Sequence, residues 1–258
     1  MTASVIGVTG LQVEIAGSRI LQGVGFDVPA TGVTALMGRN GVGKTTTVRS
    51  ILGLLPDDGR ITAGRVTFDG HDITREPTHA TIRRGVGYAP EDRGVFTRLT
   101  VAENLTLAER EGRAGRHHYD LVHDLFPDLR DRAQQRAGTL SGGQQQMLAI
   151  ARTLLNDNRL IIVDEPTKGL APRVVRQVTE ALRRVAGELP MLLVEQNLAV
   201  IRQLADRAVV LDNGRVVHSG PAAELLADRE RTTTLLGVGR AAIPRTTRVP
   251  DAEEDSTS

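Results

Sequence analysis

The sequence is poor in several residue types, and each shortage excludes a class of protein. It has no cysteine among 258 residues, which excludes disulfides and thiolate chemistry. Aromatic residues make up 2% and the net charge is +1, so neither base stacking nor a basic field favours a nucleic-acid partner. No apolar run approaches the roughly 20 residues that span a bilayer, and residues 1–10 lack the pattern of a signal peptide. We expect neither a membrane span nor a leader.

Lysine is almost missing as well. Of 32 basic residues only Lys44 and Lys168 are lysine, and the other 30 are arginine. Wherever a generic positive charge would serve, this chain uses arginine. A lysine therefore indicates a position that requires a compact ammonium group rather than a planar guanidinium.

What the sequence does contain is a series of short apolar runs that alternate with helical patterns. Near-continuous runs at 33–37, 160–163 and 191–194 each precede a turn and a longer amphipathic segment. Such runs are typical of parallel strands covered on both faces, so we predict an α/β fold. Segments 11–16, 23–28 and 64–70 alternate instead and predict an antiparallel part. Segment 207–220 predicts a hairpin with an Asn-Gly turn.

The domain organisation follows from the remaining composition. From residue 99 to 137 the pattern is helical and charged, which predicts a helical subdomain of about 92–157 inserted into one domain, 1–237. Residues 238–258 are rich in proline, threonine and charge with little to bury, so we expect a disordered tail.

The segment GRNGVGKT at 38–45 matches a P-loop between an apolar run and a helical pattern. Glycines let backbone N–H groups wrap a β-phosphate, Lys44 can reach the β- and γ-oxygens, and the Thr45 hydroxyl can bind Mg²⁺. An ordinary glycine-rich turn is the alternative, but it does not require this spacing. The predicted ATP-binding residues are Gly38, Arg39, Asn40, Gly41, Val42, Gly43, Lys44, Thr45 and Thr46.

Two acids close the apolar run LIIVDEP at 160–166. They stand at the carboxyl end of a predicted parallel strand, where α/β sheets hold their ligands. We predict that Asp164 organises Mg²⁺ and that Glu165 accepts the proton of an attacking water. An Asp-Glu-Pro sequence can also merely end a strand, but the preceding P-loop favours the catalytic interpretation.

The segment LSGGQ distinguishes P-loop families. It lies at Leu140, Ser141, Gly142, Gly143 and Gln144, between the P-loop and the acidic strand end. In this order the three motifs resemble the nucleotide-binding subunit of an ABC transporter, over about residues 10–237. The resemblance implies that these five residues bind the ATP of a facing subunit in trans, so hydrolysis would require two subunits.

The sequence departs from that family at several positions. Glu91 stands where the family has the glutamine that touches Mg²⁺, and we expect it to share the ion with Thr45 and Asp164. Gln196 replaces the usual γ-phosphate-sensing histidine and can donate a hydrogen bond but carries no charge. The resemblance implies catalytic roles for Glu165 and Gln196. Position 171 has alanine instead of the usual acid, and Ile15 and Ala16 replace the aromatic residue that stacks on adenine.

Together these segments resemble one subgroup, the second ATPase of branched-chain amino acid importers. The resemblance implies a second ATPase subunit, identical or homologous, two membrane permease subunits and an extracytoplasmic solute-binding protein, with this chain at the cytoplasmic membrane face. A urea or amide importer, a soluble ABC ATPase outside transport and a regulatory subunit without turnover stay open. The direction of transport rests on the resemblance.

Two further signals are less informative. His117, His118 and His123 could suggest a metal site, but their spacing puts them on different helix faces, and we expect a solvated helix tip. The arginine pairs at 83–84 and 183–184 could touch phosphates, yet the net charge argues against nucleic acid.

Overall fold

The centre of the molecule is a six-stranded sheet. A computed structural model describes residues 4–110 and 115–236. The strands are β3 (Val33–Met37), β6 (Val86–Ala89), β7 (Leu160–Asp164), β8 (Met191–Val194), β9 (Arg207–Asp212) and β10 (Arg215–Pro221). Their order is β10-β9-β3-β8-β7-β6, and all but β10 run parallel. The predicted parallel strands and the hairpin are confirmed; Asn213 and Gly214 have φ angles of 45° and 72°.

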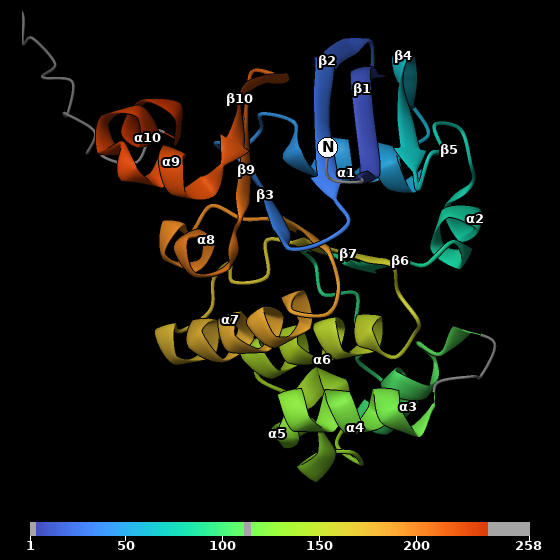
Figure 1. The fold of residues 1–258 in the computed structure, drawn as a ribbon. Helices are drawn as coiled ribbons and strands as arrows, with labels where there is room; N and C mark the ends of the chain where they lie inside the picture. Colours follow the sequence, from blue (N-terminus) through green and yellow to red (C-terminus); the bar gives the residue numbers. More distant parts are fainter. Residues whose placement is uncertain (1–3, 111–114, 237–258) are drawn as a thin grey trace, which may run out of the picture.

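A second, antiparallel sheet covers one face of the first. It consists of β1 (Ser4–Ile15), β2 (Ser18–Pro29), β4 (Gly59–Phe68) and β5 (His71–Asp72), in the order β2-β1-β4-β5. This confirms the antiparallel part that the alternating segments predict. Figure 1 shows this sheet and α1 (Lys44–Leu52) on one side of the six-stranded sheet.

Helices cover the opposite face. Between β6 and β7 the chain forms α3 (Val101–Thr106), α4 (Arg116–Leu125), α5 (Pro127–Asp131), a short 3₁₀ helix (Ala137–Thr139) and α6 (Gly142–Leu154). The other helices are α2 (Thr78–Arg83), α7 (Pro172–Ala186), α8 (Leu198–Leu204), α9 (Ala222–Ala227) and α10 (Arg229–Leu236). Figure 1 shows α3 to α7 grouped together, away from the antiparallel sheet.

The core follows from the alternation of side chains along each strand. In β7, Leu160 and Ile162 pack into the cluster that α1 and the antiparallel sheet share, whereas Ile161 and Val163 pack against α6 and α7. Both faces of this strand are therefore buried, which is why its sequence is continuously apolar. No helix among residues 4–110 and 115–236 combines the length and the apolarity that a membrane crossing requires.

One expectation about the histidines is wrong. His118 is buried, and its Nε2 lies 3.1 Å from Asp157 Oδ1, which follows α6. His118 thus packs against neighbouring structure instead of standing in solvent. The spacing of the histidines along the chain did not reveal this contact, because Asp157 lies 39 residues away.

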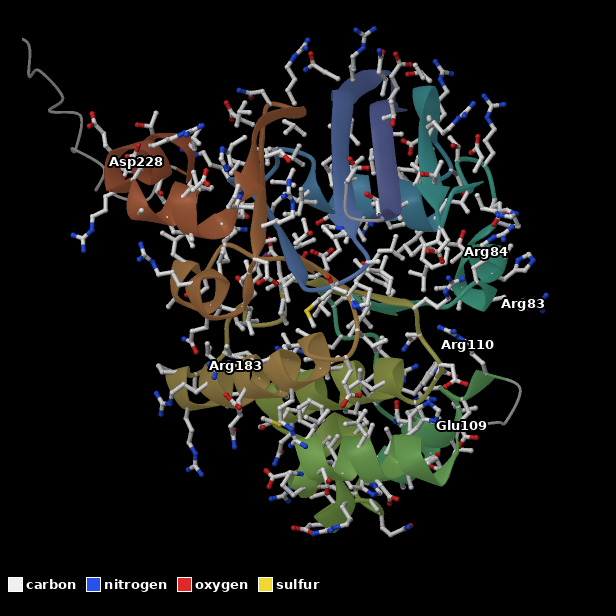
Figure 2. All side chains as sticks on the ribbon, in the orientation of Figure 1. Arg83, Arg84, Glu109, Arg110, Arg183 and Asp228 are labelled. Carbon is white, nitrogen blue, oxygen red and sulfur yellow. The ribbon has the colours of Figure 1, made fainter. Side chains whose placement is uncertain are left out.

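One arginine of each pair makes an ion pair within the chain. Arg84 binds Glu76 through two hydrogen bonds of 2.9 and 2.5 Å, and Arg183 lies 3.4 Å from Glu180. Figure 2 shows Arg83 and Arg183 on opposite outer edges of the molecule.

The predicted domain limits at 92, 157 and 237 stay predictions. The helices between β6 and β7 fall within the first two limits. The tail predicted for 238–258 lies outside the described residues.

Candidate active site

The loop at 38–43 connects the buried strand β3 to α1 and is shaped by its glycines. Gly38 (φ 143°) and Gly43 (φ 106°) adopt backbone conformations that other residues rarely take. A Cβ atom on Gly43 would lie 2.6 Å from Leu21 Cδ2, and one on Gly38 would clash with the Leu211 carbonyl oxygen. The predicted spacing is therefore required for this loop to fold. It leads into the N-terminus of α1, where backbone N–H groups favour an anion.

Lys44 opens α1 with a buried ammonium group. Its Nζ donates hydrogen bonds of 3.0 Å to the carbonyl oxygens of Gly38 and Arg39 and lies 3.7 Å from Glu165 Oε1. Burial lowers the pKa of Lys44, while the carboxylates of Glu165 and Asp164 act in the opposite direction. The loop carbonyls thus hold the ammonium inside its own loop, ready for a phosphate oxygen.

Asp164 ends β7 and is the most enclosed acid of the site. It is fully buried, and its carboxylate oxygens make no hydrogen bond of ordinary geometry with the described residues, although the Thr45 hydroxyl lies near enough to favour the charged form. Burial, assisted by the carboxylates of Glu165 and Glu91, raises the pKa of Asp164 to about 6, against the influence of Lys44 and Thr45. A buried carboxylate with so little donation to it is costly unless a positive charge is bound beside it.

A cavity brings the three predicted cation ligands together. Thr45, Glu91 and Asp164 line a space of about 640 Å³ at the carboxyl ends of β6 and β7. In the described part of the chain, no three His, Asp or Glu side chains are arranged to hold a metal alone. One hydroxyl and two carboxylates are oxygen donors that fit Mg²⁺, which takes few protein oxygens and completes its shell with phosphate oxygens and water.

Glu165 follows Asp164 in a strained conformation, with a φ angle of 45°. Its backbone N–H donates to the Val194 carbonyl oxygen at 2.8 Å, which fixes it between β7 and β8. The side chain is 7% exposed; Oε1 accepts a 2.7 Å hydrogen bond from Gln196, and Oε2 lies 3.0 Å from Lys168 Nζ. Burial alone would raise the pKa of Glu165, but the bonds from Lys168 and Gln196 and the charge of Lys44 lower it. The carboxylate is thus kept ionised, as a proton acceptor must be.

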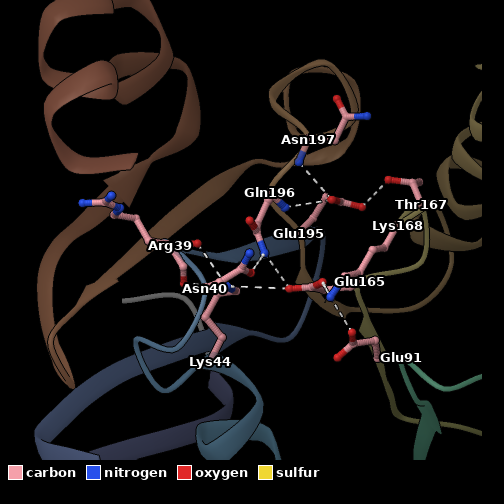
Figure 3. Close-up of polar contacts among 11 residues, drawn as sticks. Arg39, Asn40, Lys44, Glu91, Glu165, Thr167, Lys168, Glu195, Gln196 and Asn197 are labelled. Atoms are coloured by element: carbon pink, nitrogen blue, oxygen red, sulfur yellow. Dashed lines mark hydrogen bonds and ion pairs between the residues drawn. The ribbon is translucent and has the colours of Figure 1, made fainter. Parts of the chain in front are cut away.

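Gln196 connects this carboxylate to the P-loop. Its Nε2 donates to Glu165 Oε1 at 2.7 Å and to Asn40 Oδ1 at 2.6 Å, as Figure 3 shows. An amide nitrogen carries two hydrogens, so both bonds can form together. The structure therefore brings the two predicted catalytic residues into direct contact.

Glu195 is a functional candidate that sequence reasoning missed. It is 3% exposed; Oε1 accepts from the backbone N–H groups of Gln196 and Asn197 at 2.7 and 2.9 Å, and Oε2 accepts from the Thr167 hydroxyl at 2.6 Å. It thereby joins the loop of Gln196 to the turn after Glu165 (Figure 3). The sequence feature that could have identified Glu195 is its position directly after the apolar run at 191–194.

Lys168 is a second functional candidate for which the sequence predicted no specific role. It stood out only as one of the two lysines of the chain. Its Nζ lies 2.6 Å from Glu91 Oε1 and 3.0 Å from Glu165 Oε2. Hydrogen bonds to these carboxylates, that to Glu91 first, raise the pKa of Lys168. The side chain therefore places a permanent positive charge between a predicted cation ligand and the predicted base.

The LSGGQ segment begins α6 with a capping box. Ser141 Oγ accepts from the Gln144 N–H at 3.3 Å, and Gln144 Oε1 accepts from the Ser141 N–H at 3.0 Å. Ser141 and Gly142 are exposed, whereas Leu140 and Gly143 are buried. A Cβ on Gly143 would lie 2.6 Å from Val174 Cγ1 in α7, which explains that glycine.

The signature and the P-loop of this chain lie on opposite faces of the sheet. The buried apolar residues of α1 pack in the cluster beneath the antiparallel sheet, and those of α6 pack in the other cluster. Figure 1 shows the same separation. The described geometry therefore brings together all predicted site residues except those of the LSGGQ segment.

Comparisons with known proteins give the family. A model of the ABC transporter family matches residues 21–168. The high-affinity branched-chain amino acid transport ATP-binding protein BraG of Pseudomonas aeruginosa is 37% identical over 220 residues, 84% of this chain and 93% of that protein. The probable branched-chain amino acid transport ATP-binding protein LivF of Archaeoglobus fulgidus is 35% identical over 223 residues, 85% of this chain and 93% of that protein.

A solved structure of an ATP-binding subunit of an ABC transporter matches with a TM-score of 0.75 and 27% identity, over 91% of this chain and 95% of that one. The region that the family model matches contains the P-loop, the LSGGQ helix and the acidic end of β7. The chain therefore belongs to the ABC transporter family, as an ATP-binding and ATP-hydrolysing subunit.

Proposed function

We propose that this chain hydrolyses ATP to drive an importer of branched-chain or other apolar amino acids. The catalytic half of the proposal rests on one observation: the ionised carboxylate of Glu165 is held between Lys44 and Gln196 at the mouth of the P-loop. The substrate class is supported by the names of the two similar relatives, both of which are branched-chain amino acid transport proteins.

The site residues divide into three roles. Residues 38–46 bind the phosphates, with Lys44 moving from loop carbonyls to phosphate oxygens. Thr45, Glu91 and Asp164 would hold Mg²⁺, which would supply positive charge against the phosphates of the nucleotide. Glu165 accepts the proton of the attacking water. Gln196 orients that carboxylate, because its amide donates to Glu165 and to the P-loop residue Asn40 together.

The LSGGQ helix serves the nucleotide of a facing subunit. Two observations support this role: the Ser141 cap and Gly142 are exposed, and α6 lies on the other face of the sheet from this chain's own P-loop. A free helix N-terminus with a serine hydroxyl attracts a phosphate. Hydrolysis then requires a second ATPase subunit, which can be identical or homologous.

The remaining partners follow from the transport role. We infer two permease subunits in the membrane and an extracytoplasmic solute-binding protein, with this chain bound peripherally to the cytoplasmic face. Support comes from the transport role that the names of the two relatives state.

Purification of the tagged chain from its native membrane in mild detergent tests the proposal. We expect two permeases and a second ATPase to co-purify, and the complex, reconstituted in liposomes with its solute-binding protein, to hydrolyse ATP faster with leucine, isoleucine or valine. The Glu165→Gln complex serves as the inactive control. Stimulation by urea alone, or capture of ribosomal proteins in place of permeases, would contradict the proposed function.

A further inference from the structure

The ammonium group of Lys168 bridges two acids that come from different strand ends. Its Nζ lies 2.6 Å from Glu91, which follows β6, and 3.0 Å from Glu165, which follows β7 (Figure 3). The side chains of Lys168 and Glu91 are 55% and 40% exposed, whereas Glu165 is buried. One end of the bridge can therefore move, and the other is fixed.

The backbone around Lys168 is held on both sides. The Lys168 N–H donates to the Glu165 carbonyl oxygen at 3.2 Å and so closes the turn after β7. The preceding residue, Thr167, is anchored by its 2.6 Å bond to the buried Glu195. The turn thus fixes the backbone from which the Lys168 side chain reaches both carboxylates.

Glu91, which pairs with Lys168, is also a predicted ligand of the divalent cation. Glu91 lines the same cavity as Thr45 and Asp164, and apart from the nearby Thr45 hydroxyl the Asp164 carboxylate has no hydrogen-bond donor among the described residues. A divalent cation at Asp164 would attract the Glu91 carboxylate and repel the nearby ammonium. Lys168 and a cation would therefore attract the Glu91 carboxylate to two different positions.

We propose that Lys168 competes with the divalent cation for Glu91 and thereby weakens metal binding at the nucleotide site. The inference rests on the proposed function, since it assumes that Mg²⁺ is bound by Thr45, Glu91 and Asp164. In the ATP-free chain Lys168 acts as the counter-ion of Glu91. When metal and nucleotide bind, Glu91 leaves Lys168, which keeps its contact with Glu165. Lys168 is thus a positioning residue that acts through Glu91.

The affinity of the full-length chain for a non-hydrolysable fluorescent ATP analogue, measured in EDTA and at saturating Mg²⁺, tests this inference without turnover. The dissociation constant in EDTA divided by that at saturating Mg²⁺, called the Mg²⁺ ratio, reports how strongly the metal supports binding of the analogue. We expect Lys168→Met to raise this ratio roughly two- to fivefold, the size of an ion pair between half-exposed groups. Glu91→Gln should lower the ratio, and the double variant should match Glu91→Gln.

Arg49→Met is the matched control, because Arg49 lines the same cavity but makes no ion pair with Glu91 in the part of the chain that the structure describes. Its effect on the ratio should be the same in the wild-type chain and in the chain that also carries Glu91→Gln. Lys168→Gln provides a second neutral variant if Lys168→Met fails to fold.

Two results would overturn the inference while leaving the proposed function intact. One is an unchanged or reduced Mg²⁺ ratio in Lys168→Met. The other is an equal increase with and without Glu91, which would mean that the ammonium acts through Glu165 or through space. Failure of the wild-type chain to bind the analogue at all would instead overturn the proposed function, and the inference with it.

Discussion

Replacing Glu165 by glutamine removes the proton acceptor and preserves the size of the side chain. In the structure Oε1 accepts from Gln196 and Oε2 from Lys168. A glutamine amide has one acceptor oxygen, so it can keep only one of these bonds, and its NH₂ group would face a second donor. We expect Lys168 to retain Glu91 alone, while the backbone position of Glu165, fixed by the Val194 carbonyl, stays unchanged.

The expected loss is large for hydrolysis and small for binding. Removing a general base typically slows the chemical step by about 10²–10⁴-fold. ATP binding should survive or tighten, because Lys44 and the loop that positions it are unchanged and one negative charge near the triphosphate is lost. The Glu165→Gln complex should therefore accumulate with ATP bound and uncleaved.

Gln196→Ala provides the comparison. This change removes two hydrogen bonds, to Glu165 at 2.7 Å and to Asn40 at 2.6 Å, but no charge. At about 1 kcal/mol for each bond, hydrolysis should slow by roughly five- to thirtyfold. Glu165 remains ionised in this variant, since Lys168 and Lys44 still lie beside it.

Single-turnover hydrolysis in the reconstituted complex separates the two variants, with phosphate release followed after rapid mixing. Nucleotide affinity measured on the same preparations shows whether binding has changed. If Gln196→Ala proves slower than Glu165→Gln, the catalytic role has been assigned to the wrong residue.

Three further changes test other parts of the structure. Ser141→Arg should leave the affinity of the isolated chain for ATP unchanged and abolish hydrolysis in the complex; weaker binding at unchanged stability would contradict a role in trans. Thr167→Val removes the 2.6 Å donor of the buried Glu195 and should lower the free energy of unfolding in urea by about 1–3 kcal/mol; an unchanged value would show that this bond does not stabilise the fold. Glu103→Ala removes the capping box of α3. Hydrogen bonds from Thr100 lower the pKa of Glu103 below 4.5, so its contribution exists above that pH and disappears as the pH falls through the lowered value. Urea unfolding of wild type and Glu103→Ala should therefore differ at pH 7 and converge in acid; a constant difference would refute the linkage.

Much of the fold could be predicted because local patterns and tertiary environment agree. β7 and β8 are buried on both faces, and their sequences are correspondingly apolar throughout. The turn at Asn213 and Gly214 needs two left-handed residues, which this dipeptide supplies. The P-loop was recognisable because its glycines are required by positive φ angles and close contacts within a fixed spacing.

The side-chain network could not be predicted, because its members are distant in sequence. Lys168 meets Glu91 across 77 residues, and Thr167 meets Glu195 across 28. These contacts depend on the order of strands in the sheet, which apolar runs do not encode. His118 was misjudged for the same reason, since its partner Asp157 belongs to another element.

The strand order explains why these charges meet. Within the sheet β6 pairs with β7 and β7 with β8, and Asp164 stands opposite Val194 in the register. The residues that follow these strands, Glu91, Glu165 and Gln196, consequently emerge side by side, next to the P-loop after β3. The result is an alternating row of charges, Lys44, Glu165, Lys168 and Glu91, each within 3.7 Å of the next. On the roles proposed above, a triphosphate takes Lys44 from its loop carbonyls at one end of the row, and a cation takes Glu91 from Lys168 at the other. Both changes leave Lys44 and Lys168 beside Glu165, so on these roles its carboxylate stays ionised while the nucleotide and the metal bind.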